Sequence, residues 1–418
     1  MNVCIFEDQQ YKNFLPLAYL RPVFDLLCGP MSLRNNIEHI LPKQKFTLLV
    51  RPELTDVVRD ENPGVPVNTF PDDDCWFING RVLAGAHLAS LCKKPLKQSR
   101  VFLFENEMAA LFLSQPDMKR YRDQISGALP DKAMFAGLSS EAIKCTMVHY
   151  PWDLVYSAAD EIVNSFKTFQ KKFKKGKTKI YKGVYLINKK NILIGSGSVI
   201  KPGVVIDAEK GPVIIGRNVT IMPNTVIEGP AFIGDHSVIK ISAKIYHGTV
   251  IGNWCKVGGE VDMSVMLPYS NKQHDGFLGH SYIGSWVNLG ADTNTSDLKN
   301  TYGNIKVQVE EESIDTGKQF IGLMMGDHSK TGINVMLDSG TNIGISCNVY
   351  GAGLPPKFLP SFSWGGDQKF VPYDLEKNIE TAKRVMLRRG ISMSSAYEQL
   401  MRRIFSVTEL SRSKANIH

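Results

Sequence analysis

The sequence lacks several features that would assign it to a familiar class. It has no run of about eighteen apolar residues to cross a bilayer, and its first residues lack the basic start and apolar stretch of a signal peptide. Its seven cysteines are scattered without a C-x-x-C pair, so neither a disulfide framework nor a thiolate zinc site is expected. We therefore expect a cytoplasmic protein with no membrane partner.

A strong charge of one sign is also missing. The 418 residues carry a net charge of +8, and the most basic stretch, 167–179, follows Ile162 and contains or adjoins Phe166, Phe169 and Phe173 at helical spacing. We interpret these lysines as the solvated side of an amphipathic helix rather than as a patch for nucleic acid or acidic lipid. No nucleic-acid partner is expected.

Glycine is scarce in the first half of the chain. Six of the 35 glycines precede residue 151, whereas 27 lie between Gly183 and Gly366. Before residue 151, short aliphatic or aromatic runs alternate with helical intervals, as in an α/β sheet with crossover helices. We predict an α/β domain over 1–157, a linking helix over 158–182, a second domain over 183–366 and a helical tail over 367–418.

The second domain has a period of six residues. Aliphatic side chains recur at Ile215, Ile221, Ile227, Ile233, Ile239, Ile245, Ile251 and Val257. Four positions after each lies a residue that is neither bulky nor charged, ending with Val261, so both series should point into a narrow interior. Glycine recurs every eighteen residues at 216, 234 and 252, as a backbone returning to one corner would require. The pattern predicts an all-β hexapeptide parallel β-helix.

Two interruptions of this period, 269–279 and 293–319, hold most of the polar chemistry. The first contains His274 and is followed by a coil that restarts over 280–291 (HSYIGSWVNLGA). Residues 192–352 resemble left-handed β-helix acyltransferases. The His274 loop and this coil resemble, more narrowly, the acetyltransferase domain of the bifunctional glucosamine-1-phosphate N-acetyltransferase / N-acetylglucosamine-1-phosphate uridyltransferase family.

The resemblance implies that His274 is the catalytic base. Amine attack on a thioester needs a free lone pair, and an imidazole that titrates near neutrality can take the proton. A surface histidine bonded to its own loop is the alternative. The resemblance also implies substrate contacts from Phe277 and Asn288 and a backbone contact from Ala291 near the acetyl group of acetyl-CoA. Further substrate-binding candidates are Lys272, Lys299 and Asn300.

Departures from the family pattern leave the acceptor sugar open. Phe277 stands where the family has a tyrosine, and Asp297 stands where it has an asparagine. A zinc site like that of β-helix carbonic anhydrases is not expected, because His274 and His280 are six residues apart and would lie on different faces. His280 is assigned only a structural role.

The family order implies a sugar-nucleotide pyrophosphorylase domain in the first half, but its glycine-rich phosphate loop is missing. Residues 7–10 (EDQQ) follow the first strand, Arg81 replaces a metal-binding aspartate, and His149 lies near a second ligand position. Three arginines could bind phosphate directly, with ordinary surface pairs as the alternative: Arg21, Arg34 and Arg81. Use of Mg²⁺ and nucleotidyl transfer are left open.

The tail is predicted to form two helices, 375–388 and 394–405. They make Arg384, Arg388 and Arg389 available to CoA phosphates, with a solvated helix face as the alternative. The second interruption is predicted to form an arm, with a strand at 305–309, that reaches a neighbouring subunit. The resemblance implies a homotrimer.

Three functions fit these observations. The first is acetyl-CoA-dependent acetylation of an amino-sugar phosphate in nucleotide-sugar biosynthesis, with nucleotidyl transfer as an open second activity. The second is a nucleotide-sugar pyrophosphorylase with a structural β-helix, and the third is a non-catalytic protein that binds a sugar nucleotide.

Overall fold

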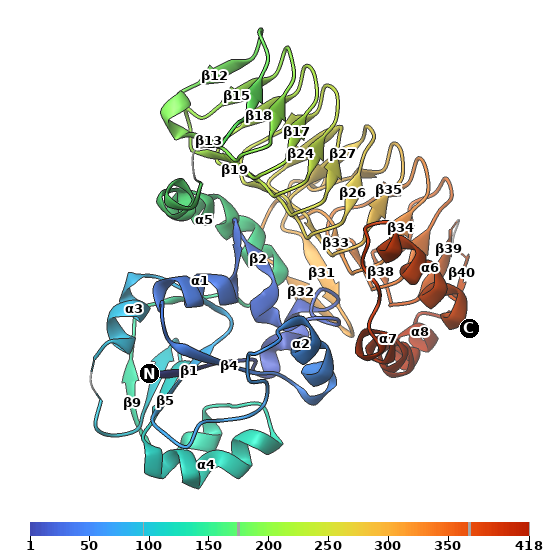
Figure 1. Ribbon diagram of the computed structural model, residues 1–418. Coiled ribbons are helices and arrows are strands. Elements are labelled where there is room, and N and C mark those ends of the chain that lie inside the picture. Colours follow the sequence, from blue (N-terminus) through green and yellow to red (C-terminus); the bar gives the residue numbers. More distant parts are fainter. Residues whose placement is uncertain (95, 174–175, 367–368, 418) are drawn as a thin grey trace.

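A computed structural model describes residues 1–94, 96–173, 176–366 and 369–417. It shows an N-terminal α/β domain, a left-handed parallel β-helix of about 10 turns and a C-terminal group of helices (Figure 1). The predicted fold class is confirmed. No helix in these described ranges is long and apolar enough to span a bilayer.

The α/β domain is built on a six-stranded sheet with the order β4-β1-β5-β8-β7-β9. The strands are β1 (Asn2–Phe6), β4 (Lys45–Leu49), β5 (Cys75–Asn79), β7 (Arg100–Phe104), β8 (Glu107–Leu113) and β9 (Ser139–Ala142). The helices are α1 (Leu33–Ile40), α2 (Thr55–Glu61), α3 (Ala86–Cys92) and α4 (Gln115–Gly127). β2 (Leu27–Cys28) and β3 (Met31–Ser32) form a short hairpin, and β6 (Val82–Leu83) pairs antiparallel with the distant strand β10 (Thr146–Met147). Because β5 is buried on both faces, apolar clusters pack on each side of the sheet.

The linking helix α5 is Pro151–Lys172, so it begins seven residues before the predicted boundary at 158. Its start is fixed by Pro151 at the first helical position and by the Asp153 carboxylate, which accepts the N–H groups of His149 and Tyr150 at 2.7 and 3.0 Å. The helix also ends before the predicted boundary at 182, because Lys179–Ile180 already form the strand β11; residues 174–175 lie outside the described residues.

Three sheets form the faces of the β-helix. The first face holds β11 (Lys179–Ile180), β14 (Val199–Ile200), β17 (Thr220–Ile221), β20 (Val238–Ile239), β23 (Lys256–Val257), β26 (Asn271–Lys272), β29 (Asn288–Leu289), β34 (Lys330–Thr331), β37 (Asn348–Val349), β39 (Ser363–Gly366) and β40 (Lys369–Pro372). The second face holds β12 (Tyr185–Ile187), β15 (Val205–Asp207), β18 (Val226–Glu228), β21 (Lys244–Ile245), β24 (Glu260–Asp262) and β27 (Phe277–Gly279), followed by the pair β30 (Asn294–Thr295) and β35 (Met336–Leu337). The third face holds β13 (Ile192–Ile194), β16 (Val213–Ile215), β19 (Ala231–Ile233), β22 (Thr249–Ile251), β25 (Val265–Met266), β28 (Tyr282–Ile283), β33 (Met324–Met325), β36 (Asn342–Ile343) and β38 (Phe358–Leu359).

One corner of the β-helix is shorter than predicted. Val261 pairs with Ile245 below and Leu278 above, so it occupies the large aliphatic position rather than the small position that the sequence suggested. The turn between β23 and β24 is therefore only Gly258–Gly259, two residues shorter than the turn between β20 and β21 in the preceding coil. This corner is recessed between longer corners.

The third face carries the α/β domain. Its outward side chains Ile214, Phe232 and Val250 belong to the same apolar cluster as the core of that domain, and α5 lies across β16, β19 and β22. Phe169 of α5 meets Phe232 edge to face at 5.8 Å. The two domains therefore share a continuous core.

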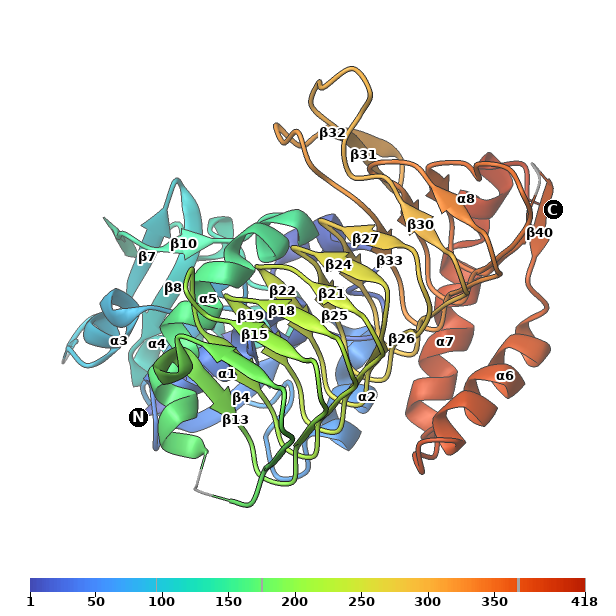
Figure 2. The same ribbon diagram turned by 90° about the horizontal axis from the view of Figure 1, so that it is seen from above.

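The arm and the tail fold against the rest of the same chain. The arm is a hairpin of β31 (Lys306–Val309) and β32 (Glu312–Asp315) that projects from the β-helix (Figure 2). At its tip, Glu310 accepts hydrogen bonds from Tyr19 of the α/β domain and Ser411 of the tail. The arm thus contacts its own α/β domain, and its contact with a neighbouring subunit stays a prediction. The tail has three helices rather than two, α6 (Leu375–Leu387), α7 (Ser395–Val407) and α8 (Glu409–Lys414).

Candidate functional site

A notch in the β-helix lies where the short corner leaves space. The turn 273–276 follows β26 directly above Gly258–Gly259, and it carries His274 with an exposed side chain. The notch has a volume of about 570 Å³. It is lined by Met222, Lys240, Ile241, Gly258, Gly259, Gln273, His274, Asp275, Ala291 and Asp292.

The notch combines an imidazole with two carboxylates. Asp275 and Asp292 come from neighbouring coils, which are joined by a hydrogen bond from the Asp292 N–H to the Asp275 carbonyl oxygen at 3.1 Å. Neither carboxylate forms an ion pair with another described residue. Such a site can attract a cationic amine through its carboxylates and can accept a proton at the imidazole.

A basic recess adjoins the notch on the first face and shares Gln273 with it. It has a volume of about 150 Å³ and is lined by Lys256, Tyr269, Asn271, Gln273, Trp286, Asn288, Val385, Arg388 and Arg389. Burial and the nearby charges of Arg389, Lys240 and Arg388 lower the pKa of Lys256. Arg389 donates a hydrogen bond to Asn271 Oδ1 at 3.2 Å, and within the described residues these cations have no carboxylate partner. The recess therefore suits an anion such as a phosphate.

The structure brings together five of the predicted residues and separates the others. His274 and Ala291 line the notch, whereas Asn288, Arg388 and Arg389 line the recess. Arg384 is exposed and paired with Glu380 on its own helix.

The remaining predicted acceptor residues lie elsewhere. Phe277 lies on the second face, where its N–H donates to Asn294 Oδ1 at 2.9 Å. Lys299 donates to the carbonyl oxygen of Asn304 at the base of the arm, and Asn300 is exposed beside it. Lys272 is buried behind the notch without lining it, and its ammonium donates to the backbone carbonyls of Gly258 and His274. His280 is bonded to Asp297 and stacks on Phe320.

Sequence reasoning missed several residues of the site. These are Lys240, Lys256, Gln273, Asp275 and Asp292. The spacing of Val257, Val261 and Met266, four and then five residues instead of six, is the signal that could have located the short corner. No three His, Cys, Asp or Glu side chains in the described ranges come together as metal ligands would.

In the α/β domain, ion pairs fill the segment that follows β1. The Glu7 carboxylate is buried, accepts the N–H of Val23 at 3.1 Å and pairs with Arg51 at 2.7 Å, and burial raises its pKa. Asp8 accepts the N–H groups of Gln10 and Tyr11 through a side-chain and a backbone oxygen at 3.1 and 3.2 Å. These amides are therefore already bonded within the turn and do not form an open phosphate cradle.

Arg81 occupies the place between the acidic groups that a divalent metal would need. Its guanidinium pairs with Asp8 at 2.7 Å and with Glu107, and it lies 3.3 Å from Nδ1 of His149. Because a fixed cation already neutralises both carboxylates, these residues do not fit Mg²⁺. Arg21 pairs with Asp327 of the β-helix, and Arg34 pairs with Asp25 at 2.8 Å. All three predicted phosphate-binding arginines are thus paired with carboxylates.

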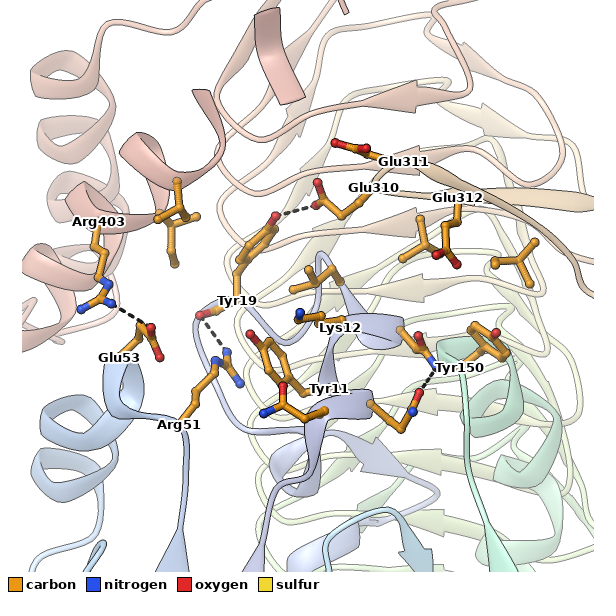
Figure 3. Close-up of a pocket in the computed structure, with 18 of the residues that line it drawn as sticks. Tyr11, Lys12, Tyr19, Arg51, Glu53, Tyr150, Glu310, Glu311, Glu312 and Arg403 are labelled. Atoms are coloured by element: carbon orange, nitrogen blue, oxygen red, sulfur yellow. Dashed lines mark hydrogen bonds and ion pairs between the residues drawn. The ribbon is translucent and has the colours of Figure 1, made fainter. Parts of the chain in front are cut away.

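A cavity of about 710 Å³ lies beside this segment (Figure 3). It is formed by the turn 9–15, the arm and α7 together, with Tyr11, Tyr19 and Tyr150 among its lining residues. Most of its charges are already paired, Arg403 with Glu53 at 2.8 Å and Arg51 with Glu7. The cavity offers aromatic rings and few free cations to a ligand.

Known proteins match both the α/β domain and the β-helix of this chain. A family profile described as sugar nucleotidyl transferase matches residues 3–174. The bifunctional protein GlmU of Methanococcus aeolicus is 32% identical over 339 residues, which cover 78% of this chain and 70% of that protein. A bifunctional sugar-1-phosphate nucleotidylyltransferase/acetyltransferase of Sulfurisphaera tokodaii is 34% identical over 143 residues, which cover 34% of this chain and 36% of that protein.

The extent of these matches differs. The chain matches only about a third of the length of the relatives from S. tokodaii and Methanocaldococcus jannaschii, 36% and 32% respectively. The match to the M. aeolicus protein instead includes most of both chains. The chain therefore belongs to the family of bifunctional GlmU-type proteins that pair a sugar nucleotidyltransferase domain with an acetyltransferase domain.

Proposed function

We propose that the β-helix transfers an acetyl group from acetyl-CoA to the amino group of an amino-sugar phosphate. The observation that supports this most directly is the continuity of the notch and the basic recess through Gln273. One end offers a base and carboxylates to an amine, and the other offers cations to the phosphates of CoA. Among the described residues these charges have no ion-pair partners, so they are available to a substrate.

In the proposed reaction, the amine nitrogen attacks the thioester carbonyl carbon. His274 accepts the proton that the amine loses, a C–N bond forms, and the C–S bond breaks to release CoA as a thiolate that then takes up a proton. Asp275 and Asp292 draw the cationic amine into the notch, where the ammonium first releases one proton to solvent so that the neutral nitrogen can attack. Arg388, Arg389 and Lys256 bind CoA phosphates.

We propose that the α/β domain binds a nucleotide sugar without Mg²⁺-dependent turnover. The bonded amides after β1 and the Arg81 ion pairs support this, although relatives are named for nucleotidyl transfer. We also propose a homotrimer. Apolar side chains exposed on the second face support a contact there, and they include Tyr185, Ile187 and Val226.

The test is one assay with two readouts, CoA release and pyrophosphate release, across several amino-sugar 1-phosphates. His274→Ala should abolish CoA release, with acetyl-CoA affinity and assembly unchanged, because a general base stabilises the transition state more than the bound ground state. His247→Ala removes an exposed histidine outside the notch and is the matched control. Activity of His274→Ala within a few-fold of wild type would reject the assignment.

A further inference from the structure

Lys272 is a charged side chain in an otherwise uncharged column of the β-helix interior. Its register partners in the coils below and above are Val257 and Leu289, and earlier coils place Ile221 and Ile239 in the same column. Lys272 is only 1% exposed. A buried ammonium is costly, so its presence needs a compensating role.

The ammonium joins the short corner to the turn that carries His274. Its Nζ donates to the carbonyl oxygens of Gly258 and His274, each at 3.1 Å. Gly259 has a φ of +70°, and a Cβ at this position would lie 2.6 Å from Nζ and 2.9 Å from the His274 carbonyl oxygen. The corner therefore requires glycine and is filled by the lysine.

No carboxylate among the described residues is hydrogen-bonded to Lys272. Burial lowers the pKa of Lys272 to about 8, and the more distant charges of Asp275, Asp292 and Glu260 oppose this shift. The lysine is thus held by backbone carbonyls of the turn rather than by an ion pair. The imidazole of His274 has no hydrogen bond to another described residue, so the backbone of the turn is what sets where this side chain begins.

We propose that Lys272 is a positioning residue for acyl transfer, and this inference rests on the function proposed above. By fixing the carbonyl of His274, its ammonium holds the imidazole over the notch. It does not touch the substrate. Lys272 therefore contributes to kcat and leaves the binding of acetyl-CoA unaffected.

The test compares Lys272→Met with Leu289→Met, which places the same side chain in the same column one coil above. We expect Lys272→Met to lower kcat about tenfold or more while KM for acetyl-CoA stays within about threefold. Leu289→Met should retain wild-type kcat, since Leu and Met differ little in volume. Lys272→Gln retains two N–H donors, so its kcat should lie between those of Lys272→Met and wild type.

Amide hydrogen exchange separates positioning from a general effect on stability. Exchange of residues 273–276 should accelerate in the order wild type, Lys272→Gln, Lys272→Met, while exchange elsewhere in the β-helix stays unchanged. The inference would be overturned if both Lys272 variants kept the kcat and the exchange rates of the wild type. It would also be overturned if Leu289→Met lost as much kcat as Lys272→Met. If His274→Ala is fully active, the proposed function fails; if it is inactive while Lys272→Met is not, only this inference fails.

Discussion

The ion pair between Arg21 and Asp327 should hold the α/β domain against the β-helix. Arg21 Nη1 donates to Asp327 Oδ1 at 2.8 Å, and its second nitrogen donates to Oδ2. The side chains are 15% and 1% exposed, and Asp327 also accepts the N–H of Ser285 at 3.1 Å. Arg21→Met would leave a buried carboxylate without its cation, so we expect a loss of about 3–5 kcal/mol in the free energy of unfolding.

A double-mutant cycle measures this coupling. Asp327→Asn removes the charge that Arg21→Met leaves unpaired, so the double variant should recover a large part of the loss, which urea denaturation would report. Arg59→Met is the matched control, because Arg59 forms an exposed pair with Asp56 and should lose less than about 1 kcal/mol. If Arg21→Met lowered the free energy of unfolding by less than about 1 kcal/mol, the structural role of Arg21 would be refuted. Arg21 would then again be a candidate for phosphate binding.

Three further outcomes are expected. Ile233→Asp should lower the melting temperature severely, because Ile233 is fully buried and the new carboxylate would have no water to solvate it. Ile233→Val is the control and should have little effect. An unchanged melting temperature for the Asp variant would contradict the hexad register. Arg81→Asp should not yield Mg²⁺-dependent pyrophosphate release from UTP and a sugar 1-phosphate, because the amides after β1 stay bonded to Asp8; robust release by this variant or the unmodified protein would refute the reasoning. Burial lowers the pKa of Lys272 from 10.5 to about 8, so the unfolded chain binds more protons between these values and stability should rise with pH there. Urea denaturation at pH 7 and at pH 10.5 measures this. Between these pH values the free energy of unfolding of the wild type should rise by about 3 kcal/mol more than that of Lys272→Met. The same pH dependence in both proteins would exclude a buried charge at Lys272.

The β-helix could be predicted from sequence because each coil repeats the same local requirement. Ile215, Ile221 and Ile227 occupy interior positions on successive faces, and six residues separate them in both sequence and structure. The prediction failed at Val261 because Val is acceptable both as a small interior residue and as a large aliphatic one. Only its pairing with Leu278 decides between the two.

The state of the α/β domain could be predicted only in part. The absence of glycine after β1 was visible, and so was Arg81 in place of an acidic residue. Its partners were not, because Asp8 and Arg81 are 73 residues apart and meet only when β1 and β5 pair. The sequence indicated that a phosphate-binding loop and a metal-binding carboxylate were missing, whereas the structure shows which ion pairs stand in their place.

The placement of the candidate site follows from how the faces of the β-helix are used. The third face is covered by α5 and the α/β domain, and the tail brings Arg388 and Arg389 over the first face. If every coil of the β-helix had the same length, its edges would be regular corners, and no notch would lie beside these arginines. Because Gly258–Gly259 shortens one corner, the turn above it overhangs a notch that opens toward these arginines. The length of a single coil thus determines where an amine and a phosphate-bearing donor could meet.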